Sequence, residues 1–516
     1  MKRLVFLLTR KTVVPWIILF VVLLLSTFQS YRLITMFKFV DEYNNWVPAG
    51  LMHQGKALYT DIFFNRMPMP AYISYLLLSL ISPQADYYRI IQIHRLFMMA
   101  FSASWIALLY WQFRRKWVVL FAASFELLKP YFFGFSFQAE AMLTYPLIYL
   151  YIMSISSKRF TVRSAIFGGI CLWFILFTRE TIAITAFLIT VVLCFRMHDH
   201  KKLLYFVGTF ALLTLITILL VPQREWLFQM ITINRMAFQH DINSISNQSG
   251  LWGTFSLPFQ YLSLIFDSGS SHFQLILASY CIIGVSLIGA YCIPFRFRSR
   301  KNILVPLYIL VLLFTSSLRV HAPEKEFWAI YRLIPWIGLL FVSICYFSDL
   351  LFTKARYVLY VSISALIVLY FIYPNSFLIK KIDRQQEYDI SYFEDISYAH
   401  AIEETTSADE NIFVIGYASH IYSLSHRKTS YPDSFYYPIH YAIPLYENKV
   451  LKMLASDPPV EVFITDCNVE STQESIKTIL DTSYVQLLKD KKPSCLYVRK
   501  DLEASVKAKL TTRGFN

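Results

Sequence analysis

The chain contains few charged residues for its length. Only 16% of its 516 residues are Asp, Glu, Lys or Arg, whereas 56% are hydrophobic; a soluble domain usually carries about a quarter charged residues. Glycine (14), proline (20) and cysteine (7) are also scarce, which argues against collagen-like, disordered and disulfide-scaffold chains. The composition therefore predicts a polytopic membrane protein, because apolar runs of about twenty residues match a hydrocarbon core of about 30 Å.

Several motifs of well-defined chemistry are missing. The sequence contains no P-loop, no GxGxxG, no HExxH and no paired CxxC, so neither nucleotide-driven transport nor zinc catalysis has motif support. The formal net charge of +14 is better explained by basic cytoplasmic loops than by nucleic-acid binding, because Lys and Arg concentrate in such loops and set the topology. We therefore expect no nucleic-acid partner.

Apolar runs separated by charged and turn residues predict about eleven membrane spans in the first 373 residues. They are placed near 13–35, 94–113, 118–133, 141–155, 164–178, 181–195, 203–221, 273–294, 303–318, 333–352 and 357–373. Basic clusters fall at alternate ends of these spans, which predicts a cytoplasmic N-terminus, and an odd number of spans then places residues 374–516 outside. The apolar segment 67–83 is short and opens with prolines, so we expect an interfacial helix there, as in the aromatic-rich loop 222–272.

The composition changes after Pro374. A charged, helical-looking stretch is followed by NIFVIGY, EVFITD and SCLYVRK, which are typical of short β-strands. The predicted fold is thus an α-helical polytopic membrane domain with outer interfacial helices (1–373) and a C-terminal extracytoplasmic α/β domain (374–516). Within the second domain, His420, His426 and Arg427 are interpreted as surface residues. Cys467 and Cys495 are either free or joined by a disulfide.

The loop after the first predicted span is rich in acids. Asp41 and Glu42 lie side by side at its start, and Asp61 follows among aromatic residues. A partly desolvated carboxylate there can accept a proton from a hydroxyl or an amine, because burial raises its pKa toward neutrality. The alternative is that the acids are solvated and only terminate a helix.

The order of residues in this loop resembles that of a known superfamily. Gly55, Tyr59, Asp61 and Pro70 follow the acidic pair and precede an apolar interfacial helix. In this the chain resembles the C-type glycosyltransferases, membrane enzymes that take a sugar from a polyprenyl-phosphate carrier, including protein O-mannosyltransferases and aminoarabinose transferases. As a motif the resemblance is concentrated in residues 41–75; as an architecture it covers most of the chain.

The resemblance implies roles for individual residues. Asp41 becomes the catalytic carboxylate that deprotonates or orients the acceptor, with Glu42 beside it and Asp61 as a secondary substrate-binding acid. Glu140, in the second outer loop, is carried over as a substrate-binding acid, with a plain helix N-terminal acid as the alternative. Arg179 is placed near the carrier phosphate, and an Arg179–Glu180 ion pair is the alternative.

A second basic cluster precedes the tenth predicted span. Tyr331 and Arg332, with Arg319, His321 and Lys325 upstream, are candidates to stabilise a leaving phosphate, since fixed cations stabilise developing negative charge. The alternative is interfacial anchoring by Arg and Trp. The superfamily commonly carries a histidine just before the tyrosine, where this chain has Ile330.

The resemblance therefore implies a membrane glycosyltransferase of glycan biosynthesis in the cell envelope. We expect it to move a sugar from a polyprenyl-phosphate donor to a glycan, lipid or protein acceptor on the outer face, by an inverting displacement, in a bacterial plasma membrane. A transporter or flippase of lipid-linked saccharides is the alternative, although it would favour internal repeats, which are absent. The sequence does not decide between a mechanism without a metal and one in which Asp41 and Glu140 hold a divalent cation, and it indicates no other cofactor.

Overall fold

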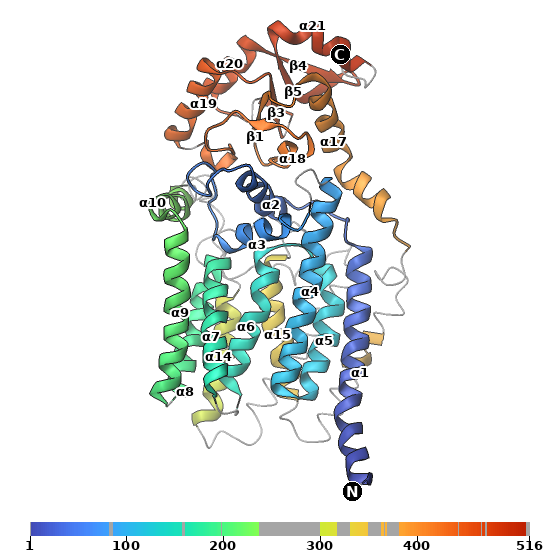
Figure 1. Cartoon of the computed structure of the whole chain (residues 1–516), viewed down its shortest axis with the longest axis vertical. Coiled ribbons are helices and arrows are strands. Elements are labelled where there is room, and N and C mark those ends of the chain that lie inside the picture. Colours follow the sequence, from blue (N-terminus) through green and yellow to red (C-terminus); the bar gives the residue numbers. More distant parts are fainter. Residues whose placement is uncertain are drawn as a thin grey trace. The chain divides into compact units, whose positions relative to one another are not determined.

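The computed structural model describes most of the chain. The described residues are 2–81, 86–156, 160–197, 199–236, 300–316, 331–348, 363–365, 367–368, 381–441, 443–465, 467–469 and 472–511. They form two compact units. Unit 1 comprises Met1–Ile34, His94–Ile216 and Asn247–Arg384, and unit 2 comprises Thr35–Ile93, Thr217–Ser246 and Gln385–Asn516. Figure 1 shows the elements in chain order.

Unit 1 is built from the apolar helices that the sequence predicts. Its elements are α1 (Lys2–Arg32), α4 (Tyr87–Phe113, from His94 on), α5 (Lys116–Leu128), η1 (Lys129–Phe132), α6 (Ala139–Ile155), α7 (Val162–Thr178), η2 (Glu180–Ile182), α8 (Ala183–Arg196), α9 (His200–Leu220), α14 (Arg300–Thr315) and α15 (Ile334–Ser348). Each predicted span within the described residues thus corresponds to a helix. The span at 273–294 lies outside them, and of 357–373 only 363–365 and 367–368 are described, as helix.

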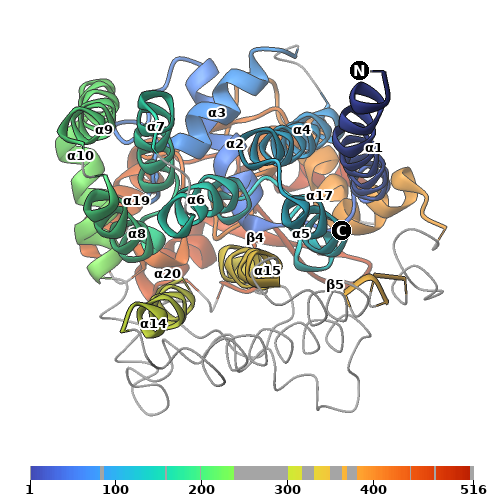
Figure 2. The same ribbon diagram turned by 90° about the horizontal axis from the view of Figure 1, so that it is seen from below.

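Helices of unit 1 pack side by side around α6 and α15. Helix α5 contacts both α1 and α15, while α6 contacts α7, α8 and α15, an arrangement seen nearly end-on in Figure 2. A Cβ atom on Gly338 of α15 would lie 2.7 Å from Cγ2 of Thr144 on α6. The close approach of these two helices therefore requires a glycine at that position.

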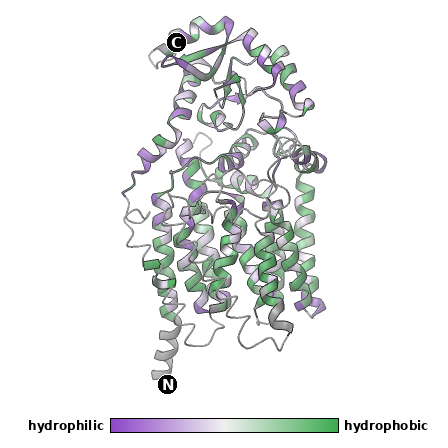
Figure 3. Ribbon diagram, turned by 180° about the vertical axis from the view of Figure 1, so that it is seen from behind, coloured by the Kyte–Doolittle hydropathy of each residue, from purple (hydrophilic) through white to green (hydrophobic). Residues whose placement is uncertain are grey.

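Three helices in the described part of the chain are long and apolar enough to cross a membrane. They are Val13–Arg32, Tyr87–Phe113 and His200–Leu220. Shorter apolar helices accompany them, and Figure 3 shows the helices of unit 1 coloured mainly as hydrophobic. The chain is therefore an integral membrane protein. The total of eleven spans and the cytoplasmic N-terminus remain predictions.

Unit 2 joins three stretches that are distant in the sequence. The first carries α2 (Val40–His53) and α3 (Met69–Leu78), and the second carries α10 (Gln223–Leu227) followed by a π-helical turn η3 (Phe228–Ile233). Helix α3 lies within the segment 67–83 predicted to be helical. The predicted interfacial loop 222–272 is described only as far as residue 236.

The third stretch forms a five-stranded mixed sheet with flanking helices. Its elements are α17 (Arg384–Thr405), β1 (Asn411–Ile415), α18 (Ile421–Leu424), β2 (Lys428–Thr429), η6 (Pro438–His440), α19 (Pro444–Ser456), β3 (Glu461–Ile464), α20 (Glu474–Ser483), β4 (Tyr484–Lys489), β5 (Lys492–Arg499), η8 (Lys500–Leu502) and α21 (Glu503–Leu510). The strand order is β2-β1-β3-β5-β4, with β1 parallel to β2 and β3, and β5 antiparallel to β3 and β4. The α/β prediction is confirmed, and β2 and β4 were missed.

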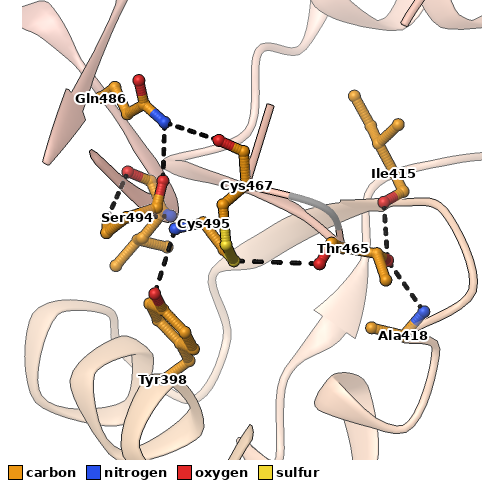
Figure 4. The surroundings of a disulfide bond; sticks show 9 residues. Tyr398, Ile415, Ala418, Thr465, Cys467, Gln486, Ser494 and Cys495 are labelled. Atoms are coloured by element: carbon orange, nitrogen blue, oxygen red, sulfur yellow. Dashed lines mark hydrogen bonds between the residues drawn. A yellow bond between two sulfur atoms is a disulfide. The ribbon is translucent and has the colours of Figure 1, made fainter. Parts of the chain in front are cut away.

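A disulfide links the end of β3 to β5. Cys467 and Cys495 are bonded, 28 residues apart in the chain, which decides between the two alternatives left open by the sequence. Figure 4 shows that the Gln486 amide donates to the carbonyls of Cys467 (3.0 Å) and Ser494 (2.8 Å), while the Cys495 N–H donates to the Tyr398 hydroxyl (3.2 Å). The bond is thus surrounded by hydrogen bonds to β4, β5 and α17.

Candidate functional site

Asp41 lies in the first turn of α2 and pairs with an arginine that the sequence did not reveal. Acids are favoured at this position because the helix N-terminus carries a partial positive charge. The Arg66 guanidinium donates to the Asp41 carboxylate, and both side chains are about one-fifth exposed, at 21% and 18%. The Tyr59 hydroxyl holds the Arg66 backbone by donating to its carbonyl at 2.7 Å. Asp41 is therefore a carboxylate with solvent access and a fixed cationic partner.

Glu42 and Asp61 have different surroundings. Glu42 is completely buried, and adjacent helical residues point about 100° apart, so the two carboxylates of the acidic pair do not face the same way. The Asp61 carboxylate accepts the N–H of Ala57 at 2.8 Å, while its own N–H donates to the Ala57 carbonyl at 2.9 Å. Asp61 thus closes the turn at residues 57–61. The catalytic role of Glu42 and the substrate-binding role of Asp61 remain predictions.

Unit 2 fixes the acidic loop against the C-terminal segment. The Phe63 N–H donates to the Asp433 carbonyl (2.8 Å), and Ser434 donates its hydroxyl to the Asp61 carbonyl (2.8 Å) while accepting from Lys56 (3.0 Å). Gln229, after α10, binds the other side of the loop through the Phe64 N–H (2.7 Å). The loop that follows α2 and carries Asp61 is therefore held by two segments far along the chain.

The interpretation of His420 as a surface residue is wrong. Its side chain is 1% exposed, its ring packs on Tyr43 of α2 (centroids 4.3 Å apart), and its Nε2 lies 3.0 Å from Oδ2 of Asp395. Lys38 approaches the same carboxylate oxygen at 2.6 Å. His426 is exposed, in agreement with the sequence interpretation, whereas Arg427 is half-buried and donates to Thr406 Oγ1 at 2.8 Å and to the Glu403 carbonyl at 3.0 Å. Burial of a histidine cannot be deduced locally, since the covering residues come from other segments.

In the cluster of Lys38, Asp395 and His420, the two partners of the histidine contact carry charge and the histidine does not. Burial raises the pKa of Asp395, but His420 and Lys38 outweigh that effect and bring the pKa to about 2. Burial lowers the pKa of His420 more than Asp395 raises it. At neutral pH the contact therefore consists of a carboxylate held by the Lys38 ammonium and a neutral imidazole, which ties α2 and the segment before it to α17 and α18.

Unit 1 brings together Glu140 and Arg179. Glu140 stands in the first turn of α6, and Arg179 is the extended residue that ends α7 before η2, so the predicted helix break is confirmed. Arg179 Nε lies 3.4 Å from Glu140 Oε1 and 4.0 Å from Glu180 Oε1. Its closer acidic neighbour is thus Glu140 rather than Glu180. The proposed contact of Arg179 with a carrier phosphate is untested.

Tyr331 and Arg332 lie immediately before α15. Tyr331 is buried, and the Arg332 Nε donates to the Tyr331 hydroxyl at 3.2 Å. The guanidinium also lies over the Tyr331 ring, 5.6 Å from its centroid. The remaining members of the predicted basic cluster, Arg319, His321 and Lys325, lie outside the described residues.

A buried polar network in unit 1 also escaped the sequence analysis. The Lys129 ammonium contacts Glu126 Oε2 (2.6 Å), the Ser102 hydroxyl (2.8 Å) and the Tyr145 hydroxyl (3.1 Å), and Tyr145 donates to Glu126 Oε1 (2.6 Å). Both ions are almost completely buried. Because these donors and acceptors satisfy one another, the network fastens α4, α5 and α6 together. The described residues contain no group of three or more His, Cys, Asp or Glu side chains placed to hold a metal ion.

Comparisons with known proteins show the fold. No protein-family model matches the chain, and no curated protein matches it. It is similar to the crystal structure of ArnT from Cupriavidus metallidurans bound to undecaprenyl phosphate, with a TM-score of 0.55 and 11% identity over 95% of this chain and 98% of that one. The apo structure of the same ArnT gives 0.53 and 10%, over 93% and 97%. The resemblance to the C-type glycosyltransferases is thus confirmed at the level of the fold.

Proposed function

We propose that this protein is a membrane glycosyltransferase that moves a sugar from a polyprenyl-phosphate donor to an acceptor on the outer face of the membrane. The observation that carries the proposal is the likeness in fold to ArnT, which extends over nearly the whole of both chains and includes a structure with undecaprenyl phosphate bound. The proposed topology has the N-terminus in the cytoplasm and residues 374–516 outside, as an extracytoplasmic domain that follows the membrane domain 1–373 in the chain.

Acceptor activation is assigned to Asp41 in unit 2. Its carboxylate accepts the proton of the acceptor hydroxyl as the hydroxyl oxygen attacks the anomeric carbon of the donor. The bond between that carbon and the phosphate oxygen breaks, and the lipid phosphate leaves with the electron pair. A single displacement of this kind inverts the configuration at the anomeric carbon. Arg66 supports the assignment because a paired guanidinium favours the ionised form of a carboxylate.

Stabilisation of the phosphate is assigned to unit 1. Arg179 and Arg332 are the candidate cations. A guanidinium can donate two parallel hydrogen bonds to two oxygens of one phosphate, and it stays protonated at neutral pH. Arg179 is already oriented by Glu140 at 3.4 Å. Arg332 is oriented by the Tyr331 hydroxyl. Fixed cations of this kind stabilise the charge that develops on the leaving group without needing to reorganise.

The test is sugar transfer by the purified protein in detergent, with a panel of radiolabelled polyprenyl-phosphate sugars. Asp41→Asn removes the base while keeping the size of the side chain, and we expect transfer to fall by about a hundredfold or more. Asp481→Asn, the same change at an exposed acid of α20 in unit 2, is the matched control and should transfer like wild type. Parallel reactions with a chelator decide whether a divalent metal takes part.

An active Asp41→Asn protein refutes the assignment of the base. No turnover of any donor by well-folded wild type counts against the transferase itself and favours the flippase alternative, which a reconstituted flipping assay would then examine. Arg179→Lys and Arg332→Lys, assayed in the same way, should weaken the interaction with the donor phosphate because an ammonium group lacks the two-pronged geometry.

A further inference from the structure

The loop that follows β1 presents an aromatic ring on a rigid support. Gly416 has φ +99°, its N–H donates to the Tyr436 carbonyl at 2.9 Å, and a Cβ atom there would lie 2.6 Å from the Thr465 hydroxyl oxygen, so only glycine fits. The Thr465 hydroxyl also accepts the N–H of Ala418 at 3.0 Å. Between these two fixed points stands Tyr417, with 43% of its surface exposed.

The Tyr417 ring belongs to a row of three stacked rings. Tyr417 lies parallel to Tyr437, with centroids 5.6 Å apart and an interplanar angle of 23°. Tyr437 lies in turn on Phe435, at 5.5 Å and 16°. Both inner rings are buried. Because the inner rings prevent Tyr417 from turning inward, its ring forms a firm exposed surface.

The topology of the sheet favours a ligand at this end of β1. Strand β1 stands between β2 and β3 and is parallel to both. After β1 the chain continues to β2, toward one edge of the sheet. After β3 it continues to β4 and β5, toward the other edge. Ligands of open α/β sheets bind outside the carboxyl ends of strands at such a divergence. Tyr417 lies two residues after the carboxyl end of β1.

The stack also leads to the proposed base within the same unit. The Tyr437 hydroxyl donates to Oδ1 of Asn44 at 3.2 Å and lies 3.4 Å from the Ser419 hydroxyl. Asn44 is three residues after Asp41 on α2, which places the two side chains on the same face of that helix. The charge of Arg66, the partner of Asp41, acts on the Tyr437 hydroxyl as well.

From this juxtaposition we infer that Tyr417 is the platform for a pyranose ring of the acceptor, so that the acceptor is a carbohydrate. The inference rests on the proposed function and names its substrate class. The C–H groups on one face of a pyranose carry weak positive charge and pack on the negative face of an aromatic ring. A lipid tail would need a wider apolar surface than one ring.

Binding of free sugars tests the platform without any donor. The full-length protein, in a detergent whose headgroup contains no sugar, is examined by saturation-transfer NMR with the methyl α-glycosides of glucose, mannose and galactose and with N-acetylglucosamine. We expect saturation transfer to the ring protons of at least one sugar in the wild type. The signal should be lost in Tyr417→Ala and kept in Tyr417→Phe, which retains the ring. Phe393→Ala, the removal of another exposed ring in unit 2, is the control and should bind like wild type.

The absence of binding by wild type, or equal binding by Tyr417→Ala, overturns the inference. In transfer assays we expect Tyr417→Ala to raise the KM for the acceptor by about tenfold and to leave the KM for the donor unchanged. A change in the donor KM alone would mean that the ring holds the donor sugar, and the acceptor assignment would fall. If Asp41→Asn is inactive but Tyr417→Ala transfers like wild type, the proposed function stands and the platform fails. If sugars bind through Tyr417 but no donor turns over, the platform stands and the proposed transferase function fails.

Discussion

Glu461, the first residue of β3, should make the α/β part of unit 2 less stable as the pH rises. It is completely buried between Ile412 of β1 and Val498 of β5. The Thr405 hydroxyl donates to its Oε1 at 2.5 Å, and its Oε2 accepts no hydrogen bond from the part of the chain that the structure describes. Burial raises the pKa of this carboxyl from 4.5 to about 8. The folded protein therefore holds Glu461 protonated at neutral pH.

The sign and size of the effect follow from this difference in pKa. The unfolded chain loses the proton near pH 4.5, whereas the folded chain keeps it until about pH 8. Between these values the unfolded state binds fewer protons, so the free energy of unfolding falls as the pH rises. The full loss is about 5 kcal/mol. Between pH 6 and pH 8 it is about 2.3 kcal/mol, or roughly fiftyfold in the opening equilibrium.

Glu461→Gln removes the ionisation and keeps the shape. The amide oxygen can still accept from Thr405, so the variant should lose the pH dependence. Hydrogen exchange measured by mass spectrometry on peptides covering β1 and β3 reports the opening equilibrium at pH 6 and pH 8, after correction for the intrinsic exchange rate. Glu394→Gln, at an exposed acid of α17, is the control and should behave like wild type. The reasoning is refuted if wild-type protection is the same at both pH values, or if Glu461→Gln retains the wild-type dependence.

Three further changes have defined outcomes. Arg66→Ala should lower the rate of transfer about tenfold or more, because it removes the cationic partner of Asp41. Arg66→Lys retains a cation and should keep most of the wild-type rate. Equal rates for the two variants in steady-state kinetics would contradict the pairing. Replacing Cys467 and Cys495 by serine opens a closed segment of 28 residues and should destabilise the sheet by about 3–4 kcal/mol, seen as faster hydrogen exchange in β4 and β5, with wild type in reductant as the comparison. Gly416→Ala, at φ +99° and with its new Cβ 2.6 Å from an oxygen after β3, should cost about 1–3 kcal/mol and speed exchange in β1; unchanged exchange would contradict the close approach.

Much of the fold could be predicted from local sequence patterns. Apolar runs predicted a helix at each predicted span that falls among the described residues, because a long apolar run favours a helix that can lie in a membrane. Apolar runs rich in β-branched and aromatic residues predicted β1, β3 and β5 in the same way. Strand β2 has only two residues, Lys428 and Thr429, and is too short to show a period. Strand β4 mixes polar and apolar residues. It is recognised only by its pairing with β5, which its own sequence does not reveal.

The candidate site was predictable only in part. Asp41 could be found because an acid pair after a membrane span is visible in the sequence, and Arg179 because a charge interrupts an apolar stretch. Their neighbours could not be found in this way. Arg66 is 25 positions from Asp41, and Glu140 is 39 positions from Arg179, and neither spacing belongs to a helical or strand repeat.

The sequence by itself thus determined a membrane chain with a C-terminal α/β segment, an acid at the start of α2 and a resemblance to the C-type glycosyltransferases. The tertiary structure decided which residues meet. It paired Asp41 with Arg66, buried His420 against Tyr43, joined Cys467 to Cys495 and stacked Tyr417 on Tyr437. The physical reason is the distance along the chain over which each depends: an element forms through interactions between neighbouring residues, whereas burial and pairing depend on surfaces contributed by segments that are tens to hundreds of residues apart.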